Sequence, residues 1–178
     1  MQTVNVNGRR VSITKFQQMH GLHVSGSLYL RGCTVLTTLP DGLRVGGSLD
    51  LSGCTALTTV SGLTVGESLN LSGCTALTAL PDDLHIGGSL DLSGCTALTT
   101  VSGLTVSGSL YLRGCTALRN IFRAGADARG YEFYGAQLAN GWRILAGCRN
   151  FSPAEAREHW AEGTECRMLA ERVIAAGG

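Results

Sequence analysis

Apolar and polar residues alternate in many short stretches of this chain, which is typical of half-buried β-strands. A Leu-x-Leu pattern recurs five times, and a Leu-x-Val or Leu-x-Ile pattern precedes each occurrence. The predicted inward pairs are Leu28 and Leu30, Leu49 and Leu51, Leu69 and Leu71, Leu90 and Leu92, Leu110 and Leu112, and, for the preceding strand, Leu22 and Val24, Leu43 and Val45, Leu63 and Val65, Leu84 and Ile86, Leu104 and Val106. Each repeat therefore predicts two short strands.

The repeats have a nearly fixed period, marked by cysteines at positions 33, 54, 74, 95 and 115 that are 21, 20, 21 and 20 residues apart. A fixed period of this length is typical of a solenoid, whose coils bury their apolar side only against their neighbours. We expect a mainly β fold: a short right-handed parallel β-solenoid of about five coils over residues 22–122, with two strands per coil of 20 or 21 residues. The connections are rich in Gly, Pro, Ser and Asp and predict turns, with one 3₁₀ piece around TALTT.

Two sets of glycines recur with the coils and predict tight corners or positive φ angles. One set precedes each cysteine and the other precedes the serine of the first-strand motif, where Glu67 replaces it once. Residues 48–65 also recur without change at 89–106, a shift of 41. Coils therefore alternate between two types, and part of the regularity reflects tandem duplication.

Both ends of the repeat array predict caps, because a solenoid would otherwise expose its core and unpaired strand edges. In residues 1–21, Asn7 and Gly8 lie between alternating stretches and predict a β-hairpin. Residues 123–178 predict a ββαα unit. Its hairpin turns near Asn140 and Gly141, one helix opens with a capping box at Ser152 and ends near Trp160, and Thr164 caps a second helix.

The run LNLSGCTALTALP resembles the leucine-rich repeat consensus LxxLxLxxN/CxL, with Cys in the Asn place. The LPxGLxVGGSLxLxGC succession looks most like the short repeats of bacterial and phage-borne leucine-rich proteins. The resemblance covers residues 22–122 and implies a repeat solenoid, without naming an activity or a binding partner. The GLxVGG segment places a second strand where many leucine-rich repeats have a helix, which favours a straighter, β-helix-like stack.

Charge and composition narrow the function classes. The 14 basic and 13 acidic side chains are scattered, which makes nucleic acid an unlikely partner. No stretch has the roughly 18 apolar residues of a membrane span, so we expect no membrane association. The N-terminus lacks the layout of a secretory signal and predicts a cytoplasmic protein, in a host cytoplasm if it is phage-encoded or exported.

The sequence contains no strong motif for catalysis or metal binding. Five cysteines between Gly and Thr in an apolar repeat, with no recurring His, indicate a packing column rather than a metal or redox site. Cys148 or Cys166 with His159 provides the residue types of a nucleophile and base, but no surrounding motif supports the pair. We expect no cofactor, no bound metal and no catalytic residue. The alternative is a small enzyme or toxin activity within residues 123–178.

The outward positions of the first strand form the best candidate for a binding surface. Tyrosine and arginine are enriched at protein interfaces, and here they lie at the two ends of a polar column. The candidate partner-binding residues are Tyr29, Arg31, Asp50, Asn70, Asp91, Tyr111 and Arg113. We therefore expect a non-enzymatic protein-binding scaffold of bacterial or phage origin; one subclass is a phage or mobile-element inhibitor that occupies a host protein sterically. The partner and the oligomeric state are not predicted.

Overall fold

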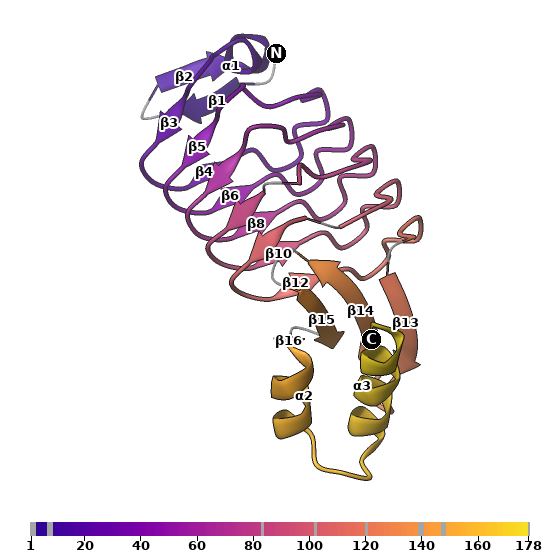
Figure 1. Cartoon of the computed structure of the whole chain (residues 1–178). Helices are drawn as coiled ribbons and strands as arrows, with labels where there is room; N and C mark the ends of the chain where they lie inside the picture. The colour runs from indigo at the N-terminus through magenta and orange to yellow at the C-terminus, as the bar shows by residue number, and fades with distance from the viewer. Residues whose placement is uncertain are drawn as a thin grey trace.

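The computed structural model describes residues 3–6, 9–82, 84–101, 103–119, 121–138, 141–146 and 149–177. The molecule is elongated, with a small N-terminal cap, a stack of coils and a C-terminal module that follow one another along its length (Figure 1). This is the expected mainly β architecture.

The stacked coils form two parallel sheets, each of five strands within the described residues. The first sheet contains β4 (Leu28–Tyr29), β6 (Leu49–Asp50), β8 (Leu69–Asn70), β10 (Leu90–Asp91) and β12 (Leu110–Tyr111). The second contains β3 (His23–Val24), β5 (Arg44–Val45), β7 (Thr64–Val65), β9 (His85–Ile86) and β11 (Thr105–Val106). Strands in each sheet are ordered by coil, so every coil pairs with the next, and the predicted parallel β-solenoid is confirmed.

Leucine and valine ladders fill the interior between the two sheets. All five Leu-x-Leu pairs are buried, and in the second strand only Leu22, in the first coil, stays partly exposed. The TALTT stretches and their equivalents form turns and extended backbone rather than the expected 3₁₀ piece. Within the described residues, four coils make one hydrogen bond between residues three apart there, such as Leu57 N–H to the Cys54 carbonyl (3.0 Å).

The two glycine sets have different roles. Glycines before cysteine have φ between 67° and 76°, as expected for a left-handed turn. Glycines before serine do not have positive φ, and they lie in bends, which is the tight-corner alternative of the prediction. Gly47 instead lies against the coil before it, where an added Cβ would lie 2.6 Å from Ser27 Oγ.

The N-terminal cap contains the expected hairpin. β1 (Thr3–Val6) pairs antiparallel with β2 (Arg9–Ser12), while the turn residues Asn7 and Gly8 lie outside the described residues. A short helix that the sequence analysis did not predict, α1 (Ile13–Gln17), follows with Ser12 as its N-cap. Phe16 of α1 is fully buried and joins the solenoid core, so this unit closes the first coil.

The C-terminal module contains the expected hairpin and helices together with two further strands. β14 (Glu132–Leu138) and β15 (Gly141–Ala146) pair antiparallel, and β13 (Ile121–Ala126) and β16 (Arg149–Phe151) flank them in the order β13-β14-β15-β16. Helices α2 (Pro153–His159) and α3 (Glu165–Ala176) follow, with the expected capping box at Ser152 and N-cap at Thr164. β13 begins at Ile121, so this sheet starts within the predicted solenoid range.

The two faces of this sheet pack against different partners. One face contributes Tyr134, Ala136, Leu138 and Leu145 to the solenoid core. The other face carries Phe133, Ile144 and Ala146, which pack with Ala156 of α2 and with Leu169, Ala170 and Val173 of α3. Alternate side chains of β14 and β15 thus pack into two different cores. The sheet covers the last coil of the stack.

Within the part of the chain that the structure describes, no helix has the length and apolar character to cross a membrane.

Candidate functional sites

The predicted binding column exists as a continuous row on the first sheet. Strand pairing places Tyr29 beside Asp50, Asp50 beside Asn70, Asn70 beside Asp91, and Asp91 beside Tyr111. Parallel strands lie about 4.8 Å apart, so Tyr29 and Tyr111, four strand steps apart, are separated by about 19 Å along the stack. We call these five residues the polar strip.

The three central residues of the polar strip also hold the backbone. One side-chain oxygen of Asp50 accepts the Ser52 N–H (2.9 Å), Asn70 accepts the Ser72 N–H (2.9 Å), and Asp91 accepts the Ser93 N–H (2.8 Å). Each bond caps the turn that leads to a positive-φ glycine, as Asx turns do. Sequence reasoning had given these positions a binding role alone, and the structure adds a folding role.

A shallow groove of about 260 Å³ lies over this sheet. Tyr29, Asp50, Asn70 and Asp91 line it together with serines and leucines of the same strands. Tyr29 is 71% exposed, whereas Tyr111, at the end nearest the C-terminal module, is only partly exposed. The two tyrosines are therefore not equivalent, although the sequence repeats them.

The next column along the first strand is not uniformly exposed; it consists of Arg31, Ser52, Ser72, Ser93 and Arg113. Arg31 and Arg113 are exposed at its two ends, but neither lines the groove. Ser52 is only 6% exposed, and its hydroxyl has no hydrogen-bond partner within the described residues. Ser52 is therefore the buried member of this column.

The cysteines form an internal column. The thiols of Cys54, Cys74, Cys95 and Cys115 are fully or nearly fully buried, and each donates to a carbonyl of the preceding coil at 3.0–3.2 Å. Burial raises the pKa of Cys54 and Cys115 to about 11 and that of Cys74 and Cys95 to about 12. Cys33, in the first coil, is only partly buried. These thiols are held neutral, which suits packing and not nucleophilic chemistry.

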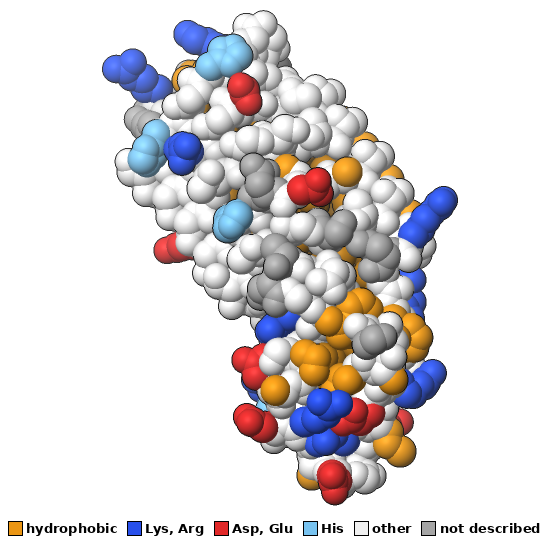
Figure 2. Space-filling model, viewed as in Figure 1, with side chains coloured by type: hydrophobic (Ala, Val, Ile, Leu, Met, Phe, Trp, Pro, Cys, Tyr) orange, Lys and Arg blue, Asp and Glu red, His pale blue; other side chains and the backbone are white. Residues whose placement is uncertain are grey.

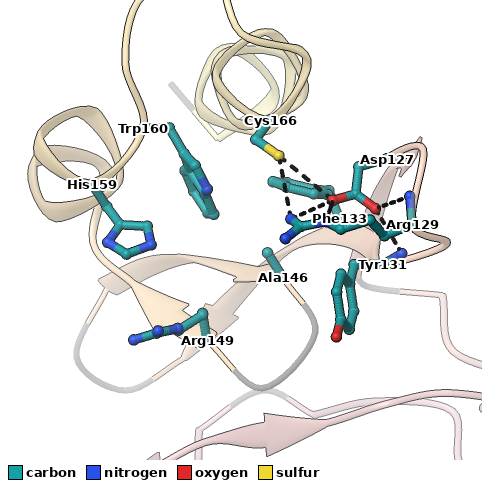
Figure 3. Close-up of a pocket in the computed structure, with 9 residues that line it drawn as sticks. All are labelled: Asp127, Arg129, Tyr131, Phe133, Ala146, Arg149, His159, Trp160 and Cys166. Carbon is teal, nitrogen blue, oxygen red and sulfur yellow. Dashed lines mark hydrogen bonds and ion pairs between the residues drawn. The ribbon is translucent and has the colours of Figure 1, made fainter.

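A second concave site lies in the C-terminal module. Nine residues line a pocket of about 380 Å³ between the sheet and the two helices, and Figure 3 shows them around a common space. They are Asp127, Arg129, Tyr131, Phe133, Ala146, Arg149, His159, Trp160 and Cys166. Volumes of this size are typical of small-molecule sites.

An aromatic cluster forms one wall of this pocket. The Trp160 ring lies 5.2 Å from Phe133 and 5.0 Å from Phe151, measured between centroids. The His159 ring contacts Phe151 at 4.7 Å and Trp160 at 5.2 Å. In Figure 3, His159 and Arg149 lie on one side of the pocket and Asp127, Arg129 and Cys166 on the other.

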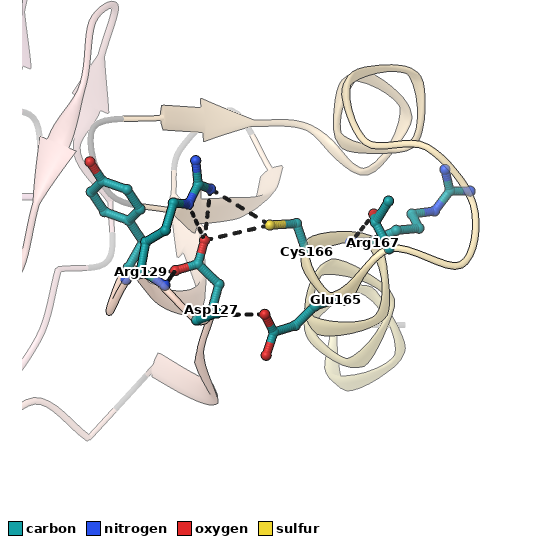
Figure 4. A network of polar contacts seen from close by, with 8 residues as sticks. Asp127, Arg129, Glu165, Cys166 and Arg167 are labelled. Atoms are coloured by element: carbon teal, nitrogen blue, oxygen red, sulfur yellow. Dashed lines mark hydrogen bonds and ion pairs between the residues drawn. The ribbon is translucent and has the colours of Figure 1, made fainter.

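Asp127 organises the opposite side (Figure 4). One carboxylate oxygen accepts the backbone N–H groups of Arg129 and Tyr131, both at 3.0 Å, and the other accepts Arg129 Nη2 at 2.7 Å. Desolvation opposes ionisation of this carboxyl, but the bonds from Arg129 and Tyr131 outweigh it and lower the pKa of Asp127 to about 2. The Arg129 guanidinium and the Asp127 carboxylate thus neutralise each other.

This network also ties the turn after β13 to the start of α3. Ala128 N–H donates to Glu165 Oε2 (2.9 Å), and the Cys166 thiol lies 3.6 Å from Asp127 Oδ2. Burial, followed by the Asp127 carboxylate, raises the pKa of Cys166. Cys166 therefore serves as a protonated donor in this network.

The candidate nucleophile and base, Cys166 and His159, line the same pocket, but no hydrogen bond joins them among the described residues. His159 makes ring contacts and no hydrogen bond to Cys166 within that part of the chain, and Cys148 lies outside it. Glu155 of α2 closes the capping box by accepting the Ser152 N–H (2.7 Å).

Sequence reasoning missed most of this pocket. Asp127, Arg129, Tyr131 and Arg149 carried no motif, and the aromatic residues looked like ordinary core positions. The DARGY segment at 127–131 was the one available signal, because Asp followed by Gly three residues later is typical of a turn.

On the face shown in Figure 2, charged side chains gather on the C-terminal module, whereas most of the solenoid surface is white, the colour of the backbone and of side chains that are neither hydrophobic nor charged. Comparison with known proteins identifies no relative: no family model, no curated protein and no solved structure matches this chain. Any functional conclusion therefore depends on the geometry of these two sites.

Proposed function

We propose that the protein is a non-enzymatic protein-binding scaffold that holds a partner segment along the polar strip. The observation that carries this proposal is the groove itself, lined by Tyr29, Asp50, Asn70 and Asp91 on a rigid parallel sheet. An exposed tyrosine beside a row of polar groups is a common composition for an interface. In keeping with the resemblance of the repeats, we place the protein among bacterial or phage-borne leucine-rich repeat proteins.

The spacing of the strip favours one kind of partner backbone. Asp50 and Asp91 are two strand steps apart, which is about 9.6 Å. A polyproline II segment places every third side chain on the same face after about 9.3 Å. An extended β-strand repeats on one face after about 6.6 or 13 Å, so it matches less well. The partner segment proposed is therefore proline-rich, with Lys or Arg at positions i and i+3.

Charge supports that choice. Asp50 and Asp91 each use one carboxylate oxygen for the turn, and the second oxygen makes no hydrogen bond or ion pair within the described residues. A cation of the partner would pair with it at the surface. Steric occupation of a host protein by such a scaffold is the form of activity that a phage or mobile-element inhibitor would have.

A charge-removing variant tests the proposal without damaging the fold. Asn70 already makes the same turn bond as the aspartates, so Asp50→Asn with Asp91→Asn retains the bond and removes both charges. We expect the melting temperature to stay nearly unchanged and the affinity for a proline-rich peptide with Arg at i and i+3 to fall about ten-fold. The control ligand is a peptide of the same composition with Arg at i and i+2, which changes only the spacing of the two cations.

The tyrosines test the surface independently of the ligand design. Tyr29→Ala with Tyr111→Ala is expected to weaken partner capture from a host lysate. Thr64→Ala with Thr105→Ala, at outward positions of the second sheet, is the matched control and is expected to leave capture unchanged. Equal capture by both double variants would contradict a role for the polar strip.

A further inference from the structure

The pocket of the C-terminal module has an excess of hydrogen-bond donors. Its one carboxylate, Asp127, is neutralised by Arg129. Arg149 also lines the pocket, is exposed, and makes no ion pair within the described residues. The pocket therefore carries one uncompensated positive charge.

Trp160 adds a second donor. Its ring is partly exposed and lines the pocket, and no acceptor for its indole N–H is found in the described part of the chain. Trp142 differs, because its indole N–H donates to the Val173 carbonyl at 2.9 Å. The two tryptophans of the chain thus differ in whether a ligand could reach the indole N–H.

Aromatic rings make up much of the remaining lining. The Phe133 and Trp160 rings lie 5.2 Å apart and are tilted by 49° to each other, with Ala146 beside them (Figure 3), and Tyr131 and His159 also line the pocket. Aromatic surfaces favour a stacked or edge-on ring, and a cation at the rim favours an anionic substituent on that ring. The volume of about 380 Å³ admits a ligand of one or two rings.

We propose that this pocket binds a small aromatic carboxylate, with the ring against Phe133 and Trp160 and the carboxylate on the Arg149 side. This site is separate from the polar strip, and its occupation does not depend on the proposed scaffold function. The ligand class follows from the lining: an aromatic wall, one unpaired guanidinium and an accessible indole N–H. Cys166 and Asp127 are already hydrogen-bonded to each other and form the opposite side of the pocket.

Benzoate is the simplest probe, and the two indole N–H signals in a ¹⁵N-correlated NMR spectrum report on it. On titration of the full chain, the Trp160 signal is expected to shift in a saturable way while the Trp142 signal stays in place. Trp160→Phe assigns the two signals. A shift of both signals together, or none at millimolar benzoate, would overturn the proposal.

A second experiment tests whether Arg149 recognises the charge of the carboxylate. Arg149→Gln is expected to weaken benzoate binding about ten-fold, and Arg149→Lys by less, because a charge-assisted hydrogen bond contributes roughly that factor. Arg172→Gln, at an exposed position of α3, is the matched control and should bind like the wild type. Benzamide, which is neutral, is expected to bind more weakly than benzoate. Equal affinities for the two ligands, or no effect of Arg149→Gln, would remove the anion from the assignment.

Discussion

The thiol of Cys74 donates a hydrogen bond of 3.2 Å to the carbonyl oxygen of Leu51, which lies in the preceding coil. The same bond joins Cys54 to Leu30, Cys95 to Leu71 and Cys115 to Leu92. These cysteines therefore do more than fill space, since each donates a second hydrogen bond to a backbone carbonyl that already accepts an N–H of its own coil, as Leu51 accepts the Cys54 N–H at 3.1 Å.

Replacing Cys74 by alanine removes both the buried sulfur and its hydrogen bond. We expect Cys74→Ala to lower the free energy of unfolding by about 1–3 kcal/mol. Thr75→Ala, at the next and exposed position, is the control and should change it by less than about 0.5 kcal/mol. Denaturant unfolding of both variants measures the difference, and equal midpoints would contradict the bond's contribution.

Thiol labelling distinguishes the cysteines by coil. At about pH 8 the four buried thiols are expected to react slowly with a soluble disulfide reagent, because burial raises their pKa to about 11–12. Cys33, which is only partly buried, is expected to react first among the five repeat cysteines. Peptide mapping by mass spectrometry assigns each label. Fast modification of Cys74 in the native state would show that the column is open.

A third prediction concerns close approach between coils. An added Cβ at Gly66 would overlap the backbone carbonyl oxygen of Gly46, so Gly66→Ala must push two coils apart. We expect it to destabilise the fold by about 3 kcal/mol or more, the range of severe overpacking. Gly26→Ala is the matched control, because nothing lies within 4 Å of an added Cβ there and its φ is not positive. Thermal melting of the two variants separates the outcomes.

Asp127 predicts a specific acid dependence of stability. Its native pKa of about 2 is below the ordinary value of 3.8, so the native state favours the charged form. The stabilisation of the native state by the ionised Asp127 carboxylate is complete above about pH 4 and is lost as the pH falls toward 2. Asp127→Asn is therefore expected to have a lower melting temperature than the wild type at neutral pH. The difference between the two melting temperatures is expected to narrow as the pH falls.

Calorimetry between about pH 6 and pH 2.5 measures this gap. Glu162→Gln, at an exposed position with no described ion pair, is the control and should show no comparable narrowing. A wild-type advantage that stays constant over this range would show that the Asp127 carboxylate is not the source.

Because the C-terminal sheet shares a core with the solenoid, we expect that neither residues 1–120 nor residues 121–178 fold well alone. Removing residues 121–178 exposes the core of the last coil, including Leu112 and Leu118. The isolated segment in turn exposes the sheet face that carries Tyr134, Leu138 and Leu145. We expect both fragments to aggregate or to lack a cooperative melting transition, as judged by sedimentation and circular dichroism. A monomeric segment 121–178 with a sharp transition would contradict this shared core.

Local patterns were sufficient for most of the fold. The Leu-x-Leu alternation determined which side chains point inward, because a strand repeats every two residues. The Ser152 capping box and the Thr164 N-cap marked both C-terminal helices for a similarly local reason. α1 was missed because it is only five residues long, too short for a helical pattern to be visible.

The binding column was partly predictable. The outward positions and their order followed from the alternation, but the bonds from Asp50 and Asp91 to serine N–H groups did not, since they depend on the path of the turn. The difference between Tyr29 and Tyr111 also lay beyond the sequence. The two residues occupy identical SLYLRGCT motifs, but Tyr111 lies at the end of the stack next to the C-terminal module.

The sequence by itself determined the coil, its two strands and its cysteine column, because these depend on contacts that recur with the repeat, and the ends of the repeat marked where the caps lie. Only the tertiary structure decided the C-terminal pocket. Asp127 comes from a turn, Phe133 and Arg149 from two strands, and Trp160 from a helix terminus, and they meet because β14 and β15 divide their side chains between two cores. No periodic pattern encodes such a meeting, since it arises from packing between elements that are distant in the sequence.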